Sequence, residues 1–188
     1  MKSSLLVVFL LGSGLPACDY HSARDNFDRQ LEVCSAGERN GLLDAAARAC
    51  GTALAIAEKE NHAPEQISTL QYRLGRLERQ RGRFTEAEAL TRRSLALEEQ
   101  SGETEAVASR LVELSLCLAG QGRWTDGAQL LASNALLQSG LTGQDRKAAA
   151  NAYRAFGIRL GKMGHEAQSE QFKKRAQELG TGQTVADR

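Results

Sequence analysis

Several features that mark common protein classes are scarce in this 188-residue chain. Aromatic residues make up only 5% and hydrophobic residues 41% of it, which fits a thin stack of helices better than a thick globular core. Only two prolines are present, so long helices are expected. The formal net charge is +1, which gives no reason to expect binding to nucleic acid or, through charge, to a membrane surface.

Patterns that carry catalysis or hold cofactors are also missing from the sequence. The histidines His21, His62 and His165 do not show the i, i+4 spacing of a zinc-binding helix. The sequence contains no paired-cysteine metal motif, no phosphate-binding glycine-rich loop and no Gly-x-Ser-x-Gly turn. We therefore expect a protein that is not an enzyme and uses no metal or other cofactor.

The first 17 residues have the composition of an export signal. Lys2 supplies a positive charge, and residues 5–11 form an apolar run that is too short to span a bilayer. The segment ends in Leu15-Pro16-Ala17-Cys18, which resembles the signal peptide of bacterial lipoproteins. The resemblance implies cleavage before Cys18, which would then be acylated and begin the mature chain. The alternative is an ordinary secretory signal with an incidental cysteine.

The lipoprotein resemblance also implies a location at the bacterial cell envelope, outside the cytoplasm. Two or more acyl chains on Cys18 would give a stable anchor, whereas a single chain binds a bilayer only reversibly. Asp19 resembles the signal that keeps enterobacterial lipoproteins in the inner membrane, and the outer membrane is the alternative. We expect residues 18–26 to form a short tether, which would keep the folded domain close to the bilayer.

A short segment recurs in the middle of the chain. Gly82-Arg83-Phe84-Thr85-Glu86-Ala87 returns 40 residues later as Gly122-Arg123-Trp124-Thr125-Asp126-Gly127. A glycine and an aromatic before an acidic helix start are typical of a turn between helices, and Thr85 with Glu88 predicts a capping box. Apolar residues at helical spacing precede the first copy. Recurrence at this period indicates helical hairpins that bury their apolar faces only against one another.

These residues resemble the tetratricopeptide repeat (TPR). Leu74-Gly75 matches the Leu-Gly pair of the family's first helix, Gly82 and Phe84 match its turn, and Ala87 matches the small residue that faces the glycine. The matching positions of the later units are Leu114, Gly122, Trp124, Gly127, Phe156, Gly157 and Gly164. The period of 40–42 residues is similar to the long repeats of kinesin light chains.

The TPR resemblance implies an all-α fold, a right-handed superhelical stack of about four helix-turn-helix hairpins. The units are expected at residues 27–62, 64–102, 104–140 and 144–179, which together form an array over residues 27–179. Residues 180–188 are expected to be a loose tail. A plain antiparallel helical bundle is the alternative fold.

In the TPR family the first helices of the hairpins line a concave groove that binds other polypeptides. The family pattern implies these principal groove positions: Tyr72, Arg76, Arg79, Val112, Leu116, Arg154 and Ile158. The other mapped positions are Thr69, Gln80, Ser109, Ala119, Gly120, Asn151, Gly161 and Lys162. Arginine and tyrosine are common binding hot spots, and the mapped groove is basic in one unit and apolar in the next. A solvated polar helix face is the alternative interpretation of the arginines.

We therefore expect a non-enzymatic adaptor or assembly factor that binds an envelope protein or peptide segment with acidic and apolar elements. A non-lipidated, secreted or periplasmic chaperone-like protein is the alternative, and a ligand-binding or catalytic helical domain is a more distant one. The sequence does not identify the partner.

The TPR resemblance implies that two cysteines occupy facing positions of the first hairpin. Export would bring Cys34 and Cys50 into an oxidising compartment, where disulfides persist. A bridge would close a loop of about 16 residues and could add roughly 3 kcal/mol of stability. Two reduced core cysteines are the alternative. Cys117 has no evident mate and is expected in the core.

Overall fold

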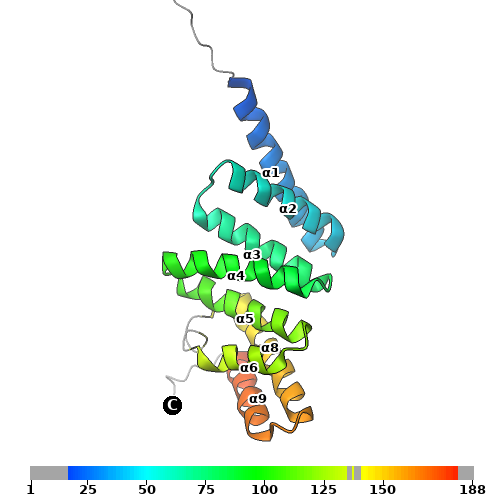
Figure 1. Cartoon of the computed structure of the whole chain (residues 1–188), viewed down its shortest axis with the longest axis vertical. Helices are drawn as coiled ribbons and strands as arrows, with labels where there is room; N and C mark the ends of the chain where they lie inside the picture. The colour runs from blue at the N-terminus through cyan, green and yellow to red at the C-terminus, as the bar shows by residue number, and fades with distance from the viewer. Residues whose placement is uncertain (1–16, 135–136, 138–140, 182–188) are drawn as a thin grey trace, which may run out of the picture.

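The computed structural model describes residues 17–134, 137 and 141–181, without the side chains of residues 17–25. Within these ranges it is built of α-helices (Figure 1). Their bounds are α1 Ala17–Arg39, α2 Leu43–Lys59, α3 Pro64–Gln80, α4 Phe84–Ser101, α5 Thr104–Gly120, α6 Trp124–Ser133, α8 Gly143–Lys162 and α9 Glu166–Thr181. No helix in the described part of the chain is both long and apolar enough to cross a membrane.

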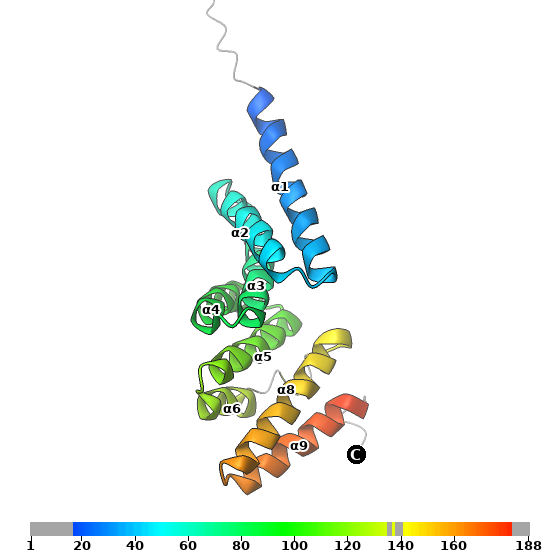
Figure 2. The ribbon, with the colours of Figure 1, turned by 90° about the vertical axis from the view of Figure 1, so that its right-hand side faces the viewer.

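The helices form successive antiparallel hairpins, α1 with α2, α3 with α4, α5 with α6, and α8 with α9. Each hairpin packs against the next, so the molecule is elongated (Figures 1 and 2). Figure 2 shows α4 and α6 on one side of the stack and α1 with the start of α8 on the other. The predicted all-α stack of hairpins is confirmed. The arrangement is therefore not the plain antiparallel bundle that was the alternative.

The repeated turn has the same geometry in both copies. Gly82 and Gly122 each have a φ of +79°, a left-handed conformation that glycine adopts without a steric penalty. The backbone N–H of Arg83 donates to the carbonyl of Glu78 at 2.8 Å, and that of Arg123 donates to Leu118 at 2.9 Å. The capping-box prediction is wrong, because α4 already begins at Phe84 and no side chain caps it.

The aromatic residue of each turn contacts the first helix of the following hairpin. A Cβ added to Gly120 of α5 would lie 2.2 Å from the Phe84 ring, so only glycine leaves room for that ring. Trp124 meets Phe156 of α8 edge to face, with ring centroids 5.2 Å apart. Glu166 holds the equivalent position in α9, after which no further hairpin follows among the described residues. The turn aromatics therefore join one repeat to the next.

Small residues let the two helices of a hairpin approach closely. A Cβ on Gly75 would lie 2.9 Å from the Thr91 hydroxyl and 3.4 Å from the Ala87 carbonyl oxygen. A Cβ on Gly127 would lie 2.8 Å from the carbonyl oxygen of Ser115. The signature glycines are thus positions where α3 meets α4 and where α5 meets α6.

The hydrophobic core is divided into two clusters. One lies in the first two hairpins and the other in the last two. Between them, four polar residues that are at most 8% exposed form a network: Ser68, Ser94, Glu98 and Arg110. The Arg110 guanidinium donates to Glu98 Oε1 at 2.9 Å and to Ser94 Oγ at 3.1 Å, and the Ser68 hydroxyl donates to the same Glu98 oxygen at 2.6 Å. Polar contacts therefore complete the junction of α3, α4 and α5.

The first hairpin differs from the expectation at its start. Helix α1 begins at Ala17, so the backbone of residues 18–26, where a tether was expected, is helical. Most of the expected signal peptide, the Cys18 side chain and residues 182–188 of the expected tail lie outside the described structure. Cys34 and Cys50 form a disulfide that joins α1 to α2, with their Cα atoms 5.1 Å apart.

The third hairpin has a short second helix. Helix α6 has 10 residues, whereas α4 has 18. Beyond its end, Leu137 and Leu141 are buried, and the Arg175 guanidinium donates to the carbonyl oxygen of Leu137 at 2.9 Å. Leu137 and Leu141 therefore belong to the core of the last two hairpins.

Candidate protein-binding groove

Five of the seven principal groove residues predicted from the family pattern lie around one pocket, which has a volume of about 150 Å³. Tyr72, Arg76 and Arg79 come from α3, and Val112 and Leu116 come from α5. Residues of the first two turns of α8 complete the lining. The pocket therefore lies where the first helices of three successive hairpins meet.

Two of the principal residues lie elsewhere on α8. Arg154 donates to the side chain of Asn151 at 2.9 Å, and Ile158 is half exposed. Helix α8 approaches α5 through its first turns, where Asp145 accepts a hydrogen bond of 2.6 Å from the Ser109 hydroxyl. Gly120 was also mapped to the groove, but it lies against Phe84.

Most arginines around α3 are paired with carboxylates. Arg79 Nε lies 2.5 Å from Glu113 Oε1, and Arg73 lies 2.5 Å from Glu38. Arg81 and Arg83 both contact Glu78. Arg76 differs because it is exposed and its contact in the described structure is the Tyr72 ring, 5.6 Å from the guanidinium carbon. The positive charge available to a partner in this pocket is therefore concentrated at Arg76.

The ring of Tyr72 contacts two guanidinium groups. Arg110 lies over its ring at 4.2 Å on the side of the buried network, and Arg76 lies at 5.6 Å. Burial, and after it the nearby Glu113 carboxylate, raises the pKa of Tyr72 to about 12. The phenol therefore keeps its proton at neutral pH and can donate a hydrogen bond.

Sequence reasoning missed the two carboxylates of this pocket. Glu113 is buried beside Val112, and Asp145 lies in the first turn of α8. Glu113 neutralises Arg79, so the groove is less basic than the mapped positions suggested. The sequence did indicate that Glu113 could lie near the groove, because it directly follows the mapped residue Val112. Its ion pair with Arg79, however, depends on how α3 and α5 pack.

A second pocket, of about 310 Å³, lies between α1 and α3. Phe27, Leu31 and Leu70 give it an apolar lining, and Thr69 and Arg73 also border it. The Arg73 guanidinium is paired with Glu38 and also donates to the Ser35 hydroxyl at 2.9 Å, so its charge is already neutralised. This pocket is therefore suited to an apolar side chain.

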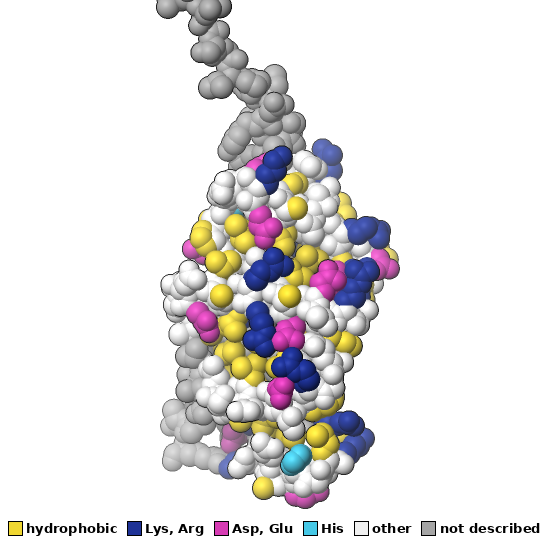
Figure 3. Space-filling model, in the orientation of Figure 1, with side chains coloured by type: hydrophobic (Ala, Val, Ile, Leu, Met, Phe, Trp, Pro, Cys, Tyr) yellow, Lys and Arg dark blue, Asp and Glu magenta, His cyan; other side chains and the backbone are white. Residues whose placement is uncertain are grey.

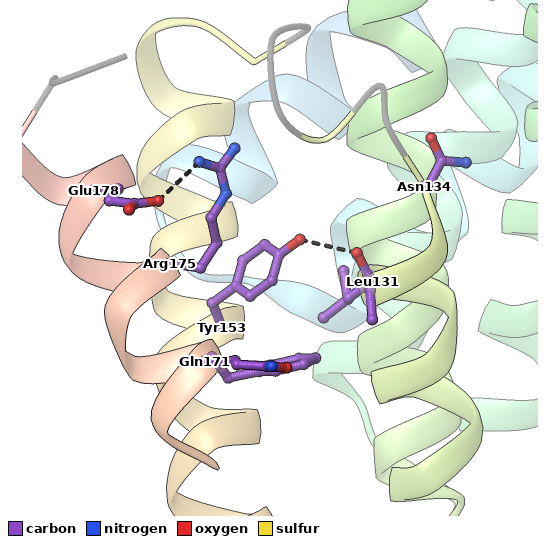
Figure 4. A pocket seen from close by; sticks show the side chains of 8 residues that line it. Leu131, Asn134, Tyr153, Gln171, Arg175 and Glu178 are labelled. Carbon is purple, nitrogen blue, oxygen red and sulfur yellow. Dashed lines mark hydrogen bonds and ion pairs between the residues drawn. The ribbon is translucent and has the colours of Figure 1, made fainter. Parts of the chain in front are cut away.

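A third pocket, of about 300 Å³, lies between the end of α6 and α9 (Figure 4). Tyr153 donates to the carbonyl oxygen of Leu131 at 3.0 Å, and Arg175 pairs with Glu178 at 3.2 Å. These polar groups are engaged with the protein itself. We therefore place the candidate site at the α3, α5 and α8 junction.

Charges of both signs are interspersed over the face in Figure 3. The described residues contain no cluster of histidine, cysteine or carboxylate side chains suited to a metal ion. Burial raises the pKa of Cys117 to about 12, so this core thiol stays protonated and is a poor nucleophile.

The fold is similar to a solved structure. The crystal structure of a kinesin light chain with nearly identical TPR-like repeats from Podosopora anserina matches with a TM-score of 0.63. The match covers 85% of this chain and 77% of that one, at 16% sequence identity. The fold is a TPR-like helical stack. No protein-family model matches the sequence, and no curated protein does.

Proposed function

We propose that this chain is a non-enzymatic adaptor or assembly factor that binds a segment of another polypeptide in the groove of its TPR-like stack. The observation that carries the proposal is the pocket at the α3, α5 and α8 junction. It presents the exposed cation of Arg76 and the side chain of Tyr72 beside the apolar Val112 and Leu116. Such a surface suits a partner that combines a carboxylate with an aliphatic side chain.

The proposal includes a location at the bacterial cell envelope, with the chain anchored by an acylated Cys18. The lipoprotein-like sequence before Cys18 and the retention-like Asp19 support an anchor in the inner membrane. The disulfide between Cys34 and Cys50 supports export, because structural disulfides persist in oxidising compartments.

Photocrosslinking in the producing cells tests the binding site. A photoreactive residue at Leu116 in the pocket is expected to capture a specific partner, whereas one at the exposed Ala96 of α4 is not. Arg76→Glu should weaken the capture at Leu116, and Arg93→Glu on α4 should leave it unchanged. Equal capture from Leu116 and Ala96, or capture unaffected by Arg76→Glu, would count against the groove.

Mass spectrometry of the mature N-terminus tests the anchor separately. An acylated Cys18 is the expected result. A processed but unmodified N-terminus would instead support the non-lipidated chaperone-like alternative.

A further inference from the structure

The last hairpin of the stack carries an excess of positive charge. Helices α8 and α9 contain eight lysine and arginine residues but four aspartate and glutamate residues, a net charge of +4, whereas the whole chain has a net charge of +1. The remainder of the chain is therefore net negative, and the small overall charge conceals a basic end. Such a local excess of cations attracts anionic surfaces even when the protein as a whole is nearly neutral.

Three of these cations are exposed on the second half of α8 and have no carboxylate partner among the described residues. Arg154 donates to Asn151 Oδ1 at 2.9 Å, and Arg159 lies over the Trp124 ring, 5.6 Å from its centroid. Lys162 makes no polar or ring contact within the part of the chain that the structure describes. Their charges are therefore available to an outside anion.

Two exposed apolar side chains stand among these cations. Ile158 is 50% exposed and Met163 is 41% exposed. Ile158 lies four residues from both Arg154 and Lys162, so these three share one face of α8. Met163 follows Arg159 by four residues and caps the end of the helix. We call these five residues the basic surface of α8: Arg154, Ile158, Arg159, Lys162 and Met163.

The basic surface of α8 is separate from the candidate groove. Helix α8 borders the groove pocket through its first two turns, as far as Ala148. Ile158 follows ten residues later, about 15 Å farther along the helix at about 1.5 Å per residue. Figure 1 shows the turn between α8 and α9 at the end of the molecule opposite the start of α1.

We propose that the basic surface of α8 binds the surface of a bilayer that contains anionic phospholipids. Its guanidinium and ammonium groups pair with the headgroup phosphates, and each such cation strengthens binding to an anionic leaflet about fivefold. The side chains of Ile158 and Met163 enter the boundary between headgroups and acyl chains, where burial of their apolar surface adds to the binding.

The mixture of cations and aliphatic side chains favours a bilayer over other anionic partners. Nucleic acid offers phosphates too, but single strands are held by aromatic side chains on which bases stack, and this surface has none. A stable interface between folded proteins takes about 20–30 residues from each side, many more than this surface contains. A bilayer satisfies both kinds of side chain at once.

Two carboxylates of α9 lie close to this surface. Lys173 packs beside α8, since a Cβ added to Gly157 would lie 3.1 Å from its Cγ atom. The hydrogen bond from Lys173 to Glu170, and after it the charge of Glu166, raises the pKa of Lys173. Glu170 is therefore neutralised by Lys173, whereas Glu166 opposes the binding of phosphate. Removal of the Glu166 charge should strengthen the contact.

A bilayer contact at this end of the stack is independent of the groove and of acylation at Cys18. Where the chain is also anchored by its other end, the anchor confines the basic surface near the membrane, so that even a weak contact is populated. The two contacts together would hold the long axis of the stack along the bilayer.

Vesicle binding by the full chain tests the proposal. Cys18→Ser is present throughout, so that no acyl chain contributes, and the vesicles contain phosphatidylcholine alone or about one third phosphatidylglycerol. Sedimentation should show about tenfold or stronger binding to the anionic vesicles, and salt should reduce this preference because it screens exposed charges. Equal binding to both kinds of vesicle would overturn the proposal.

Substitutions assign the preference to the basic surface of α8. Arg154→Gln with Lys162→Gln should weaken binding to the anionic vesicles about 25-fold, at about fivefold per cation, and Glu166→Gln should strengthen it. Arg48→Gln with Arg93→Gln removes the same charge at exposed positions of α2 and α4 and is the matched control. An equal loss in both double variants would mean that only net charge matters, and the assignment to α8 would be wrong.

A fluorescent label reports whether this end of the molecule enters the bilayer. Met163→Cys is labelled with a polarity-sensitive dye, because two native cysteines are bridged and the third, Cys117, is buried. The dye emission should shift to the blue on anionic vesicles, whereas a dye on Ala96→Cys of α4 should show no shift. Absence of a shift at position 163 contradicts insertion. The proposal also fails if a double-stranded DNA probe binds through the same cations more tightly than the anionic vesicles do.

Discussion

Arg110 and Glu98 form a buried ion pair between the two halves of the core, and its removal should have an unusually large effect. Their side chains are 9% and 7% exposed, and the pair is completed by the hydroxyls of Ser68 and Ser94. Arg110→Met leaves the Glu98 carboxylate without its cation, and Glu98→Leu leaves the guanidinium of Arg110 without its anion.

The expected cost follows from the loss of one partner of a buried pair. Each single substitution should lower the free energy of unfolding by about 3–5 kcal/mol, because the remaining charge stays buried and uncompensated. The double variant should cost much less than the sum of the two, because it leaves no unpaired charge. Glu99→Leu, at an exposed position next to Glu98, should change stability by only about 0.5 kcal/mol.

Urea denaturation followed by circular dichroism measures these differences. With a slope of about 2 kcal/mol per molar urea, a loss of 3 kcal/mol lowers the midpoint by about 1.5 M. Single variants that each lose less than about 1 kcal/mol, or a double variant whose loss equals the sum, would refute the view that a desolvated pair joins the two halves.

Three further predictions concern other contacts. Replacing Cys34 and Cys50 together by alanine should lower the free energy of unfolding in urea by roughly 3 kcal/mol. The disulfide would be rejected if the urea midpoint did not change and the unreduced wild type contained free thiols. Gly120→Ala should destabilise the stack by about 1–3 kcal/mol, because the added Cβ meets the Phe84 ring. The double variant with Phe84→Leu should recover part of this loss. A Gly120→Ala variant as stable as the wild type would contradict this packing. The pKa of Tyr72 is raised from 10.0 to about 12, so its contribution to stability is complete below pH 10 and is lost as the pH rises toward 12. Burial also raises the pKa of Tyr153, so ultraviolet titration of tyrosinate should show late-ionising phenols, of which Tyr72→Phe removes one. The same titration curve in both proteins would contradict this assignment.

The hairpins could be predicted because their turns are specified locally. Gly82 and Gly122 have to reach a left-handed conformation, and an aromatic residue follows each at the same distance, so the repeat is visible in the sequence itself. The start of α1 and the end of α6 were harder to predict. Leu137 and Leu141 could equally have continued a helix, and their burial against the last hairpin depends on residues such as Arg175 that are distant in sequence.

The candidate site was only partly visible in the sequence. The family pattern located Tyr72, Arg76 and Arg79, because groove positions recur at fixed places in each unit. It could not show that Arg79 pairs with Glu113 while Arg76 has no carboxylate partner among the described residues, because charge pairing depends on which side chains meet across two helices.

The sequence by itself determined the repeating helix–turn–helix units, since backbone conformation at the glycines and apolar periodicity act over a few residues. Only the tertiary structure decided where charge and apolar surface remain available to a partner. Arg73 and Arg76 stand three residues apart on the same helix, yet one is bound to Glu38 of α1 and the other lies over Tyr72 at the pocket. The physical reason is that a charge is neutralised by its neighbours in space, which the stacking of separate hairpins sets.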